Sequence, residues 1–139
     1  MYEYRCKVVK IIDGDTVDVD IDLGFGVWMH KERIRLYGID TPESRTRDLE
    51  EKKYGLAAKK FLTGMLDDPE GIILKTHKDA TGKFGRILGE LWRTTNYADQ
   101  SINDYMIEKH HAAAYLGQSK THIEAQHLKN RELVNLNEE

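Results

Sequence analysis

The segment that decides the fold is R-I-R-L-Y-G-I-D-T-P-E, from Arg33 to Glu43. Its first half alternates apolar and polar residues, so it predicts a strand on which Arg33 and Arg35 share one face. Pro42 cannot donate to a strand ladder and disfavours helix at the residue before it, so the strand has to end here. A cation, two carboxylates and a backbone carbonyl are thereby held near a strand end, which suits a site for a metal and a phosphate. From this segment alone, a polar strand that runs into a turn is the simpler interpretation.

The rest of the chain predicts further strands and three helices around this segment. Strands are predicted at Tyr2–Ile12, Thr16–Ile21, about Trp28–Ile39, Gly71–His77 and Arg86–Trp92, and helices at Asp48–Leu66, from Ile102 to about His110 and from Thr121 to about Val134. Gly55 lies inside the first helix and lowers its intrinsic stability by roughly 1 kcal/mol relative to Ala. Three strands, a helix, two strands and two helices in this order predict an α+β protein, a five-stranded OB-fold β-barrel with three α-helices.

Length and composition narrow the class of protein. A chain of 139 residues with 40% hydrophobic and 32% charged residues fits one domain, residues 1–139, with one core. No apolar run approaches the roughly 20 residues of a membrane helix, and Met1–Arg5 has no apolar signal region, so we expect a cytoplasmic protein without a membrane partner. A secreted form from which a signal had been removed would look the same. Cys6 is the single cysteine, so no intrachain disulfide can form.

The net charge of the chain indicates which kinds of partner it can bind. A formal net charge of −3 and a pI of about 6.1 argue against a protein that coats nucleic acid non-specifically, but they are compatible with an enzyme that has a local basic site. We expect a monomer without an obligate protein partner.

Several residues have both a structural and a functional interpretation. Asp15 lies in a turn that favours Asp, and it could also supply a hard oxygen ligand. Arg35 and Arg86 are candidate phosphate clamps because the guanidinium fork matches phosphate oxygens, but either could be a surface strand residue. Taken singly, the structural interpretation is the stronger for each. The aspartates at 18, 20 and 22 do not continue as a calcium-binding EF-hand loop and predict a solvent face, and the six histidines show no metal-binding spacing.

Four short motifs occur together in one order. They are Ile12-Asp-Gly-Asp-Thr-Val17, Arg35-Leu-x3-Asp-Thr-Pro-Glu43, Lys53-Tyr-Gly55 and Lys83-Phe-Gly-Arg86. In this order and spacing they resemble the staphylococcal nuclease (thermonuclease) family, and weaker similarity extends through 101–114 and 121–128. The fold of that family is an OB barrel with three helices, which agrees with the fold predicted from periodicity.

The resemblance implies a calcium-dependent nuclease that hydrolyses phosphodiester bonds of DNA and possibly RNA, usually leaving 3′-phosphates. By resemblance, Asp15, Asp40 and the backbone carbonyl of Thr41 would bind Ca²⁺, Glu43 would be the general base, Arg35 and Arg86 would stabilise charge on phosphorus, and Lys83, Phe84 and Tyr115 would lie near the nucleotide. Two departures from the family should weaken nucleotide binding more than chemistry. Phe84 and Ala113 stand where the family often has tyrosines.

Two other function classes are compatible with parts of this sequence. A domain of this type that has lost its catalytic residues would be a non-catalytic module that binds nucleic acid or peptide, and an OB barrel could also bind saccharides. The complete set favours the enzyme, because a binding module has no need of two metal carboxylates, a general base and two phosphate arginines together. A saccharide binder has only the barrel in its favour, since aromatic residues make up 9% of the chain.

Overall fold

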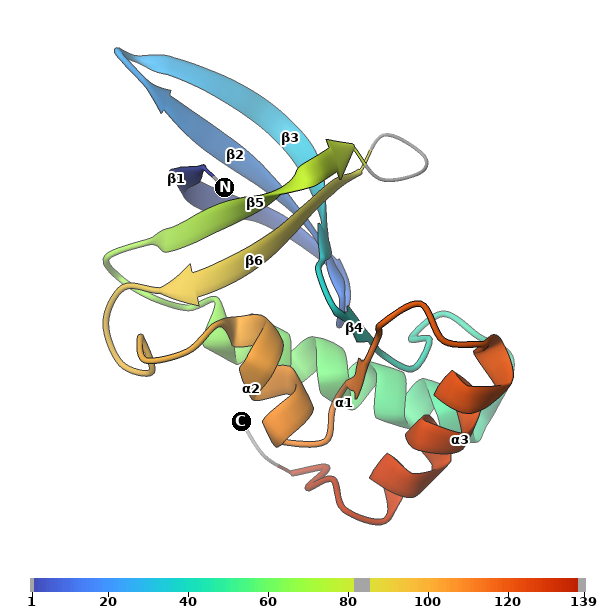
Figure 1. Ribbon diagram of the computed structural model, residues 1–139. Coiled ribbons are helices and arrows are strands. Elements are labelled where there is room, and N and C mark those ends of the chain that lie inside the picture. Colours follow the sequence, from blue (N-terminus) through green and yellow to red (C-terminus); the bar gives the residue numbers. More distant parts are fainter. Residues whose placement is uncertain (1, 82–85, 138–139) are drawn as a thin grey trace.

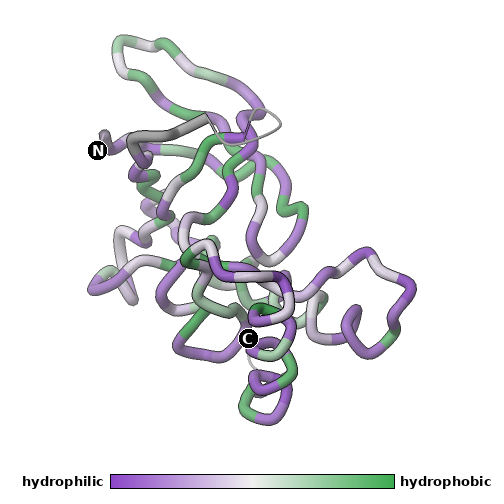
Figure 2. The backbone as a smooth tube through the Cα atoms, turned by 45° about the vertical axis from the view of Figure 1, so that its right-hand side comes forward, coloured by the Kyte–Doolittle hydropathy of each residue, from purple (hydrophilic) through white to green (hydrophobic). Residues whose placement is uncertain are grey.

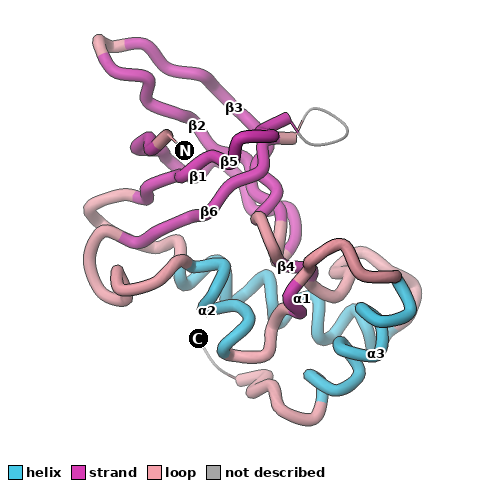
Figure 3. Tube along the Cα trace, viewed as in Figure 1, coloured by secondary structure: helices cyan, strands magenta, loops and turns pink. Residues whose placement is uncertain are grey.

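The computed structural model describes residues 2–81 and 86–137, and for 78–81 it describes the backbone alone. Its strands are β1 (Glu3–Asp13), β2 (Thr16–Gly24), β3 (Val27–Leu36), β4 (Ile39–Asp40), β5 (Ile72–Thr81), β6 (Ile87–Arg93) and β7 (Ala113–Ala114), and its helices are α1 (Leu49–Met65), α2 (Ile102–Glu108) and α3 (Lys120–Arg131). The strands of the barrel and the helices are segregated, with the helices gathered at one end of the barrel (Figures 1 and 3). Among the helices described, none has the length and apolar composition that crossing a bilayer requires.

The barrel closes in the order β1-β2-β3-β6-β5, which confirms the predicted five-stranded barrel with three helices. The first three strands form an antiparallel meander, and β5 and β6 form a hairpin whose β5 pairs back onto β1. The barrel closes on its other side where β3 and β6 run parallel, with Ile34 opposite Ile87. Hydrophobic and hydrophilic residues alternate along the strands (Figure 2), so one face of each strand fills the barrel. Val17, Val19 and Ile34 are fully buried in it.

The strand that carries Arg35 ends earlier than predicted. The sequence predicts a strand to about Ile39, but β3 ends at Leu36 and the chain turns at Gly38, which has a φ of 79°. Such a φ suits glycine and breaks a strand. Ile39 and Asp40 then form a separate strand, β4, which pairs with the two-residue strand β7. This break moves the Asp40 segment off the barrel wall and towards the helices.

Helix α1 is confirmed with close to its predicted bounds, and Gly55 has a packing role in it. The carboxylate of Asp48 accepts hydrogen bonds from the N–H groups of Glu50 and Glu51 and caps the helix. A Cβ at position 55 would overlap with the carbonyl group of Glu43 and come within 2.7 Å of the Ser44 nitrogen. Glycine at position 55 therefore lowers the helix propensity but allows α1 to pack closely against the Glu43 segment.

The start of α2 agrees with the sequence prediction, and the start of α3 does not. Helix α2 begins at Ile102 as predicted, and Ser101 caps it, since the Ser101 hydroxyl accepts from the N–H of Asp104. The helix predicted from Thr121 begins one residue earlier, at Lys120, because Ser119 is its cap: the Ser119 hydroxyl accepts from the N–H of His122 at 3.2 Å. The helix also ends at Arg131 rather than near Val134.

Candidate active site

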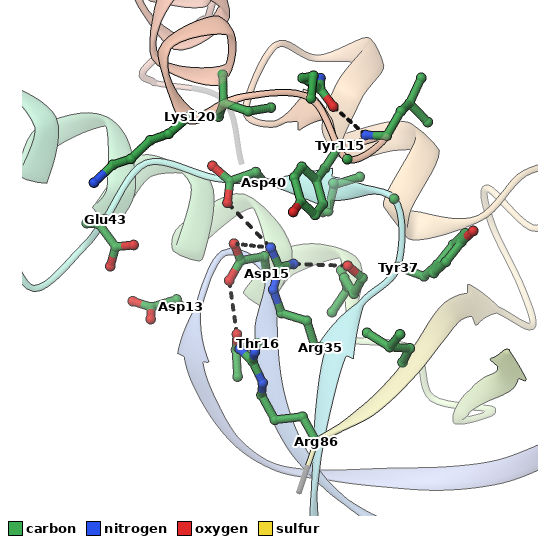
Figure 4. Close-up of a pocket in the computed structure, with 18 residues that line it drawn as sticks. Asp13, Asp15, Thr16, Arg35, Tyr37, Asp40, Glu43, Arg86, Tyr115 and Lys120 are labelled. Atoms are coloured by element: carbon green, nitrogen blue, oxygen red, sulfur yellow. Dashed lines mark hydrogen bonds and ion pairs between the residues drawn. The ribbon is translucent and has the colours of Figure 1, made fainter. Parts of the chain in front are cut away.

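A cavity of about 930 Å³ opens where the β1–β2 turn, the end of β3 and β4 meet. Six of the residues predicted for the site line it: Asp15, Arg35, Asp40, Glu43, Arg86 and Tyr115 (Figure 4). Thr41 adjoins Asp40 and is buried, with 4% of its surface exposed. Lys83 and Phe84 lie outside the described residues. The structure thus brings together side chains from segments that are far apart in the sequence.

Arg35 lies between the two carboxylates predicted to bind metal. Its Nη2 is 3.4 Å from Asp15 Oδ2 and 3.4 Å from Asp40 Oδ1. Its Nη1 donates a hydrogen bond to the carbonyl of Leu36 at 3.0 Å. Only 15% of the Arg35 side chain is exposed, so this guanidinium is held in one place by a strand and three oxygens.

Asp15 joins the β1–β2 turn to the segment that follows β4. Its Oδ2 accepts from the backbone N–H of Thr41 at 3.1 Å, and its Oδ1 accepts from the Thr16 hydroxyl at 2.9 Å. The Thr41 hydroxyl oxygen is buried and finds no hydrogen-bond partner within the described ranges. These bonds fix the backbone of Thr41 beside the Asp15 carboxylate, where its carbonyl is one of the predicted ligands.

The oxygen donors fit a hard divalent cation. Carboxylates of Asp13, Asp15, Asp40 and Glu43 line the same cavity. In the part of the chain that the structure describes, no three His, Cys, Asp or Glu side chains form a metal-binding group. The predicted ligand set is of a different kind from a group of three side chains, because it consists of two carboxylates and one main-chain carbonyl. The remaining coordination positions of the ion would be taken by water and substrate. Ca²⁺ and Mg²⁺ both take such oxygen ligands.

Glu43 lies at the edge of the cavity on a segment held from several sides. Its backbone N–H donates to Glu51 Oε2 at 3.0 Å, and the next residue, Ser44, hydrogen-bonds through its hydroxyl to Asp13. Partial burial, followed by repulsion from neighbouring carboxylates, raises the pKa of Glu43 above its usual range. The neighbouring carboxylates are Asp13, Asp15, Asp40 and Glu51. A higher pKa makes this carboxylate a stronger proton acceptor when it is ionised.

His127 contacts the site although the sequence did not indicate it. Its Nε2 is 2.8 Å from Asp40 Oδ2, and 13% of its side chain is exposed. Nε2 carries the hydrogen, because a carboxylate can only accept one. The two residues are 87 positions apart, so no local pattern could have paired them.

Arg86 and Tyr115 also line the cavity. Arg86 precedes β6, which lies parallel to β3, so both candidate phosphate arginines come from the same junction of the barrel. Tyr115 follows β7, its N–H donates to the carbonyl of Gly38 at 2.7 Å, and 46% of its surface is exposed.

The sequence was compared with known families and proteins. The family described as staphylococcal nuclease homologue matches residues 33–135. The chain is 35% identical to Protein ParB of Escherichia coli over 118 residues, 81% of this chain and 58% of that protein. It is 34% identical to the thermonuclease of Staphylococcus intermedius over 85 residues, 61% of this chain and 46% of that protein, and 29% identical to the micrococcal nuclease of Shigella flexneri over 118 residues, 81% and 59% of the two chains.

The chain spans about half the length of the relatives that it matches first. The family match, in contrast, covers most of this chain and includes the segment around Arg35 and Asp40 as well as all three helices. The protein therefore belongs to the family of staphylococcal nuclease homologues.

Proposed function

We propose that the protein is a metal-dependent phosphodiesterase that cleaves DNA and possibly RNA. The observation that carries this proposal is the position of Arg35 between Asp15 and Asp40, in a cavity that Glu43 and Arg86 also line. Membership of a family whose relatives include proteins named thermonuclease and micrococcal nuclease supports it.

The two arginines would bind the phosphate that is cleaved. A guanidinium donates two parallel hydrogen bonds to phosphate oxygens and keeps its charge at any working pH. Arg35 and Arg86 would therefore hold the phosphodiester in the cavity. They would also stabilise the negative charge that grows as phosphorus becomes five-coordinate.

Asp15, Asp40 and the carbonyl of Thr41 would hold a divalent cation, which we propose to be Ca²⁺. When bound, such an ion neutralises phosphate charge and lowers the pKa of nearby water. Glu43 would take a proton from the attacking water, and its raised pKa suits this role. Asp15 would in addition keep the Thr41 backbone in place through the hydrogen bond that it accepts from it.

The test is cleavage of single-stranded DNA in calcium and in EDTA, by the unaltered protein and by Arg35→Gln. Arg33→Gln is the matched control, since Arg33 lies on the same strand, pairs with Asp18 at 2.9 Å and is absent from the described lining of the cavity. We expect cleavage that needs calcium, falls by roughly 10²–10³-fold in Arg35→Gln and changes little in Arg33→Gln. Cleavage that persists in EDTA and in Arg35→Gln would contradict the proposal. Binding of DNA without cleavage would instead identify a non-catalytic binding module.

A further inference from the structure

Tyr37 presents a large aromatic surface on a fixed backbone. It follows β3 directly, and 47% of its surface is exposed. Its N–H donates to the carbonyl of Gly89 at 2.8 Å, and its own carbonyl accepts from Asn103 Nδ2 at 2.8 Å. These two hydrogen bonds hold the backbone of Tyr37 in place. Tyr37 is also one of the residues that line the cavity.

One side of the Tyr37 ring is supported by a second ring. The imidazole of His77, on β5, stacks on it with centroids 3.7 Å apart and planes inclined by 15°. Nε2 of His77 is 2.8 Å from Glu90 Oε2, and the other oxygen of Glu90 accepts from Trp92 Nε1 at 3.2 Å. The support is thus itself held by hydrogen bonds between β5 and β6. A ring fixed in this way loses little conformational entropy when a ligand stacks on it.

The charge around this stack is compatible with a polyanion. Both oxygens of the Glu90 carboxylate have hydrogen-bond donors, from His77 and Trp92. Lys75 adds a positive charge on the same outward face, since its Nζ lies 4.0 Å from the centroid of the Trp92 ring. The acidic residues of the cavity lie elsewhere: Asp40 and Glu43 are on one side of Arg35, and Tyr37 is on the other (Figure 4).

We propose that Tyr37, supported by His77 and Glu90, is a stacking subsite for one nucleobase of a bound single strand. The inference rests on the proposed function, in which Arg35 contacts a phosphate of that strand. Arg35 and Tyr37 are two residues apart in the sequence and line the same cavity, so the phosphate and the base of one nucleotide can reach both. Stacking on an aromatic ring accepts any base, because every base has a π face. The subsite is separate from Tyr115, which belongs to a different segment of the chain.

The experiment measures binding of single-stranded DNA hexamers in calcium by fluorescence anisotropy, in a Glu43→Gln background that suppresses cleavage. Each hexamer lacks the base at one position. We expect one position at which base removal weakens binding on the order of tenfold in the Glu43→Gln protein. When Tyr37→Ala is added, removal of that base should no longer weaken binding. When Tyr37→Phe is added, its removal should still weaken binding about as much. Tyr97→Ala is the control, because Tyr97 is 59% exposed and lies on the loop after β6.

A structural role alone would give a different result. If Tyr37→Ala weakens binding of intact and abasic hexamers by the same factor at every position, the subsite is refuted, while calcium-dependent cleavage that requires Arg35 would still support the proposed function. In the opposite outcome, removal of one base weakens binding only when Tyr37 is present, but the unaltered protein does not cleave DNA. That result would overturn the nuclease and keep the subsite.

Discussion

Glu43 is the residue whose protonation the structure perturbs most clearly within the cavity. Partial burial and then the surrounding carboxylates disfavour its ionised form, so its pKa in the folded protein lies above the ordinary value of 4.5. A raised pKa means that the folded state binds this proton more tightly than the unfolded chain does. The stability that the protonated form contributes is fully present below pH 4.5 and is lost as the pH rises through the folded-state pKa.

Glu43→Gln should therefore stabilise the metal-free protein at neutral pH. The neutral amide avoids the repulsion that the carboxylate meets, so we expect a higher Tm at pH 7, and a difference that shrinks to zero below pH 4.5, where Glu43 is itself protonated. Thermal unfolding followed by circular dichroism at both pH values in EDTA measures this. Glu50→Gln, in the exposed first turn of α1, is the control and should bring no gain. A lower Tm of Glu43→Gln at pH 7 would show that the carboxylate is stabilising.

His127 is expected to position Asp40 for metal binding. Its Nε2–H donates a hydrogen bond to Oδ2 of Asp40, while Oδ1 of Asp40 lies near Arg35. Hydrogen bonds to a ligating group typically contribute 10–100-fold to metal affinity. His127→Ala should weaken Ca²⁺ binding by that factor in isothermal titration calorimetry without nucleic acid. His127→Gln, which keeps an N–H donor, should restore part of the affinity.

His122 gives the matched control for this measurement. It lies on the same helix, is exposed and lies outside the described lining of the cavities. His122→Ala should therefore bind calcium as the unaltered protein does. Equal affinities in His127→Ala and His122→Ala would show that Asp40 needs no support from α3.

At the scale of elements, α1 positions the Glu43 segment through Gly55. Any side chain at position 55 would overlap with the backbone of Glu43 and Ser44, which has no flexible end that could move aside. Although Ala is favoured over Gly in a helix by roughly 1 kcal/mol, we expect Gly55→Ala to lower both the Tm and the cleavage rate, because the Glu43 segment must shift. Gly64→Ala, at an exposed glycine of the same helix, should lower neither. An unchanged cleavage rate in Gly55→Ala would mean that the segment adapts freely.

The elements that could be predicted are those with a long and regular pattern. The strict alternation of β2 and the helical spacing of α1 each repeat over several residues, so local chemistry determines them. The end of β3 depends on a positive φ at Gly38, and β7 is two residues long, which is too short to have a period. At α3, the sequence predicts a start at Thr121, whereas in the structure Ser119 caps the helix. The choice between them depends on packing that is not local.

The same division applies to the candidate site. Asp15, Arg35 and Asp40 lie in motifs that can be read along the chain, and the structure brings them together. The contact of His127 with Asp40 and the stack of Tyr37 on His77 each join segments that are distant in sequence. Each of these residues alone has an ordinary structural explanation, and only the fold places it beside its partner.

At the scale of the whole molecule, the fold gathers negative charge at one end of the barrel. Asp13 ends β1 and Asp15 lies in the β1–β2 turn. Asp40 comes from β4, and Glu43 comes from the loop before α1. Folding thus brings together carboxylates that repel one another, and the contacts of Arg35, Arg45 and His127 with them offset part of this repulsion. A divalent cation at this point would bind the folded state and not the unfolded chain, so it should stabilise the whole domain.

Calcium is therefore expected to raise the Tm of the protein. At a concentration 100 times the dissociation constant, binding to the folded state alone adds about 2.7 kcal/mol, which corresponds to roughly 5–10 °C for a domain of this size. Asp40→Asn should abolish most of this rise, because it removes a ligand. Asp20→Asn should retain it, since Asp20 lies on β2 and accepts from the Lys31 N–H instead. Differential scanning calorimetry in calcium and in EDTA makes the comparison. A calcium-dependent rise that survives Asp40→Asn but not Asp20→Asn would place the ion on the outer face of β2 and remove the metal from the proposed mechanism.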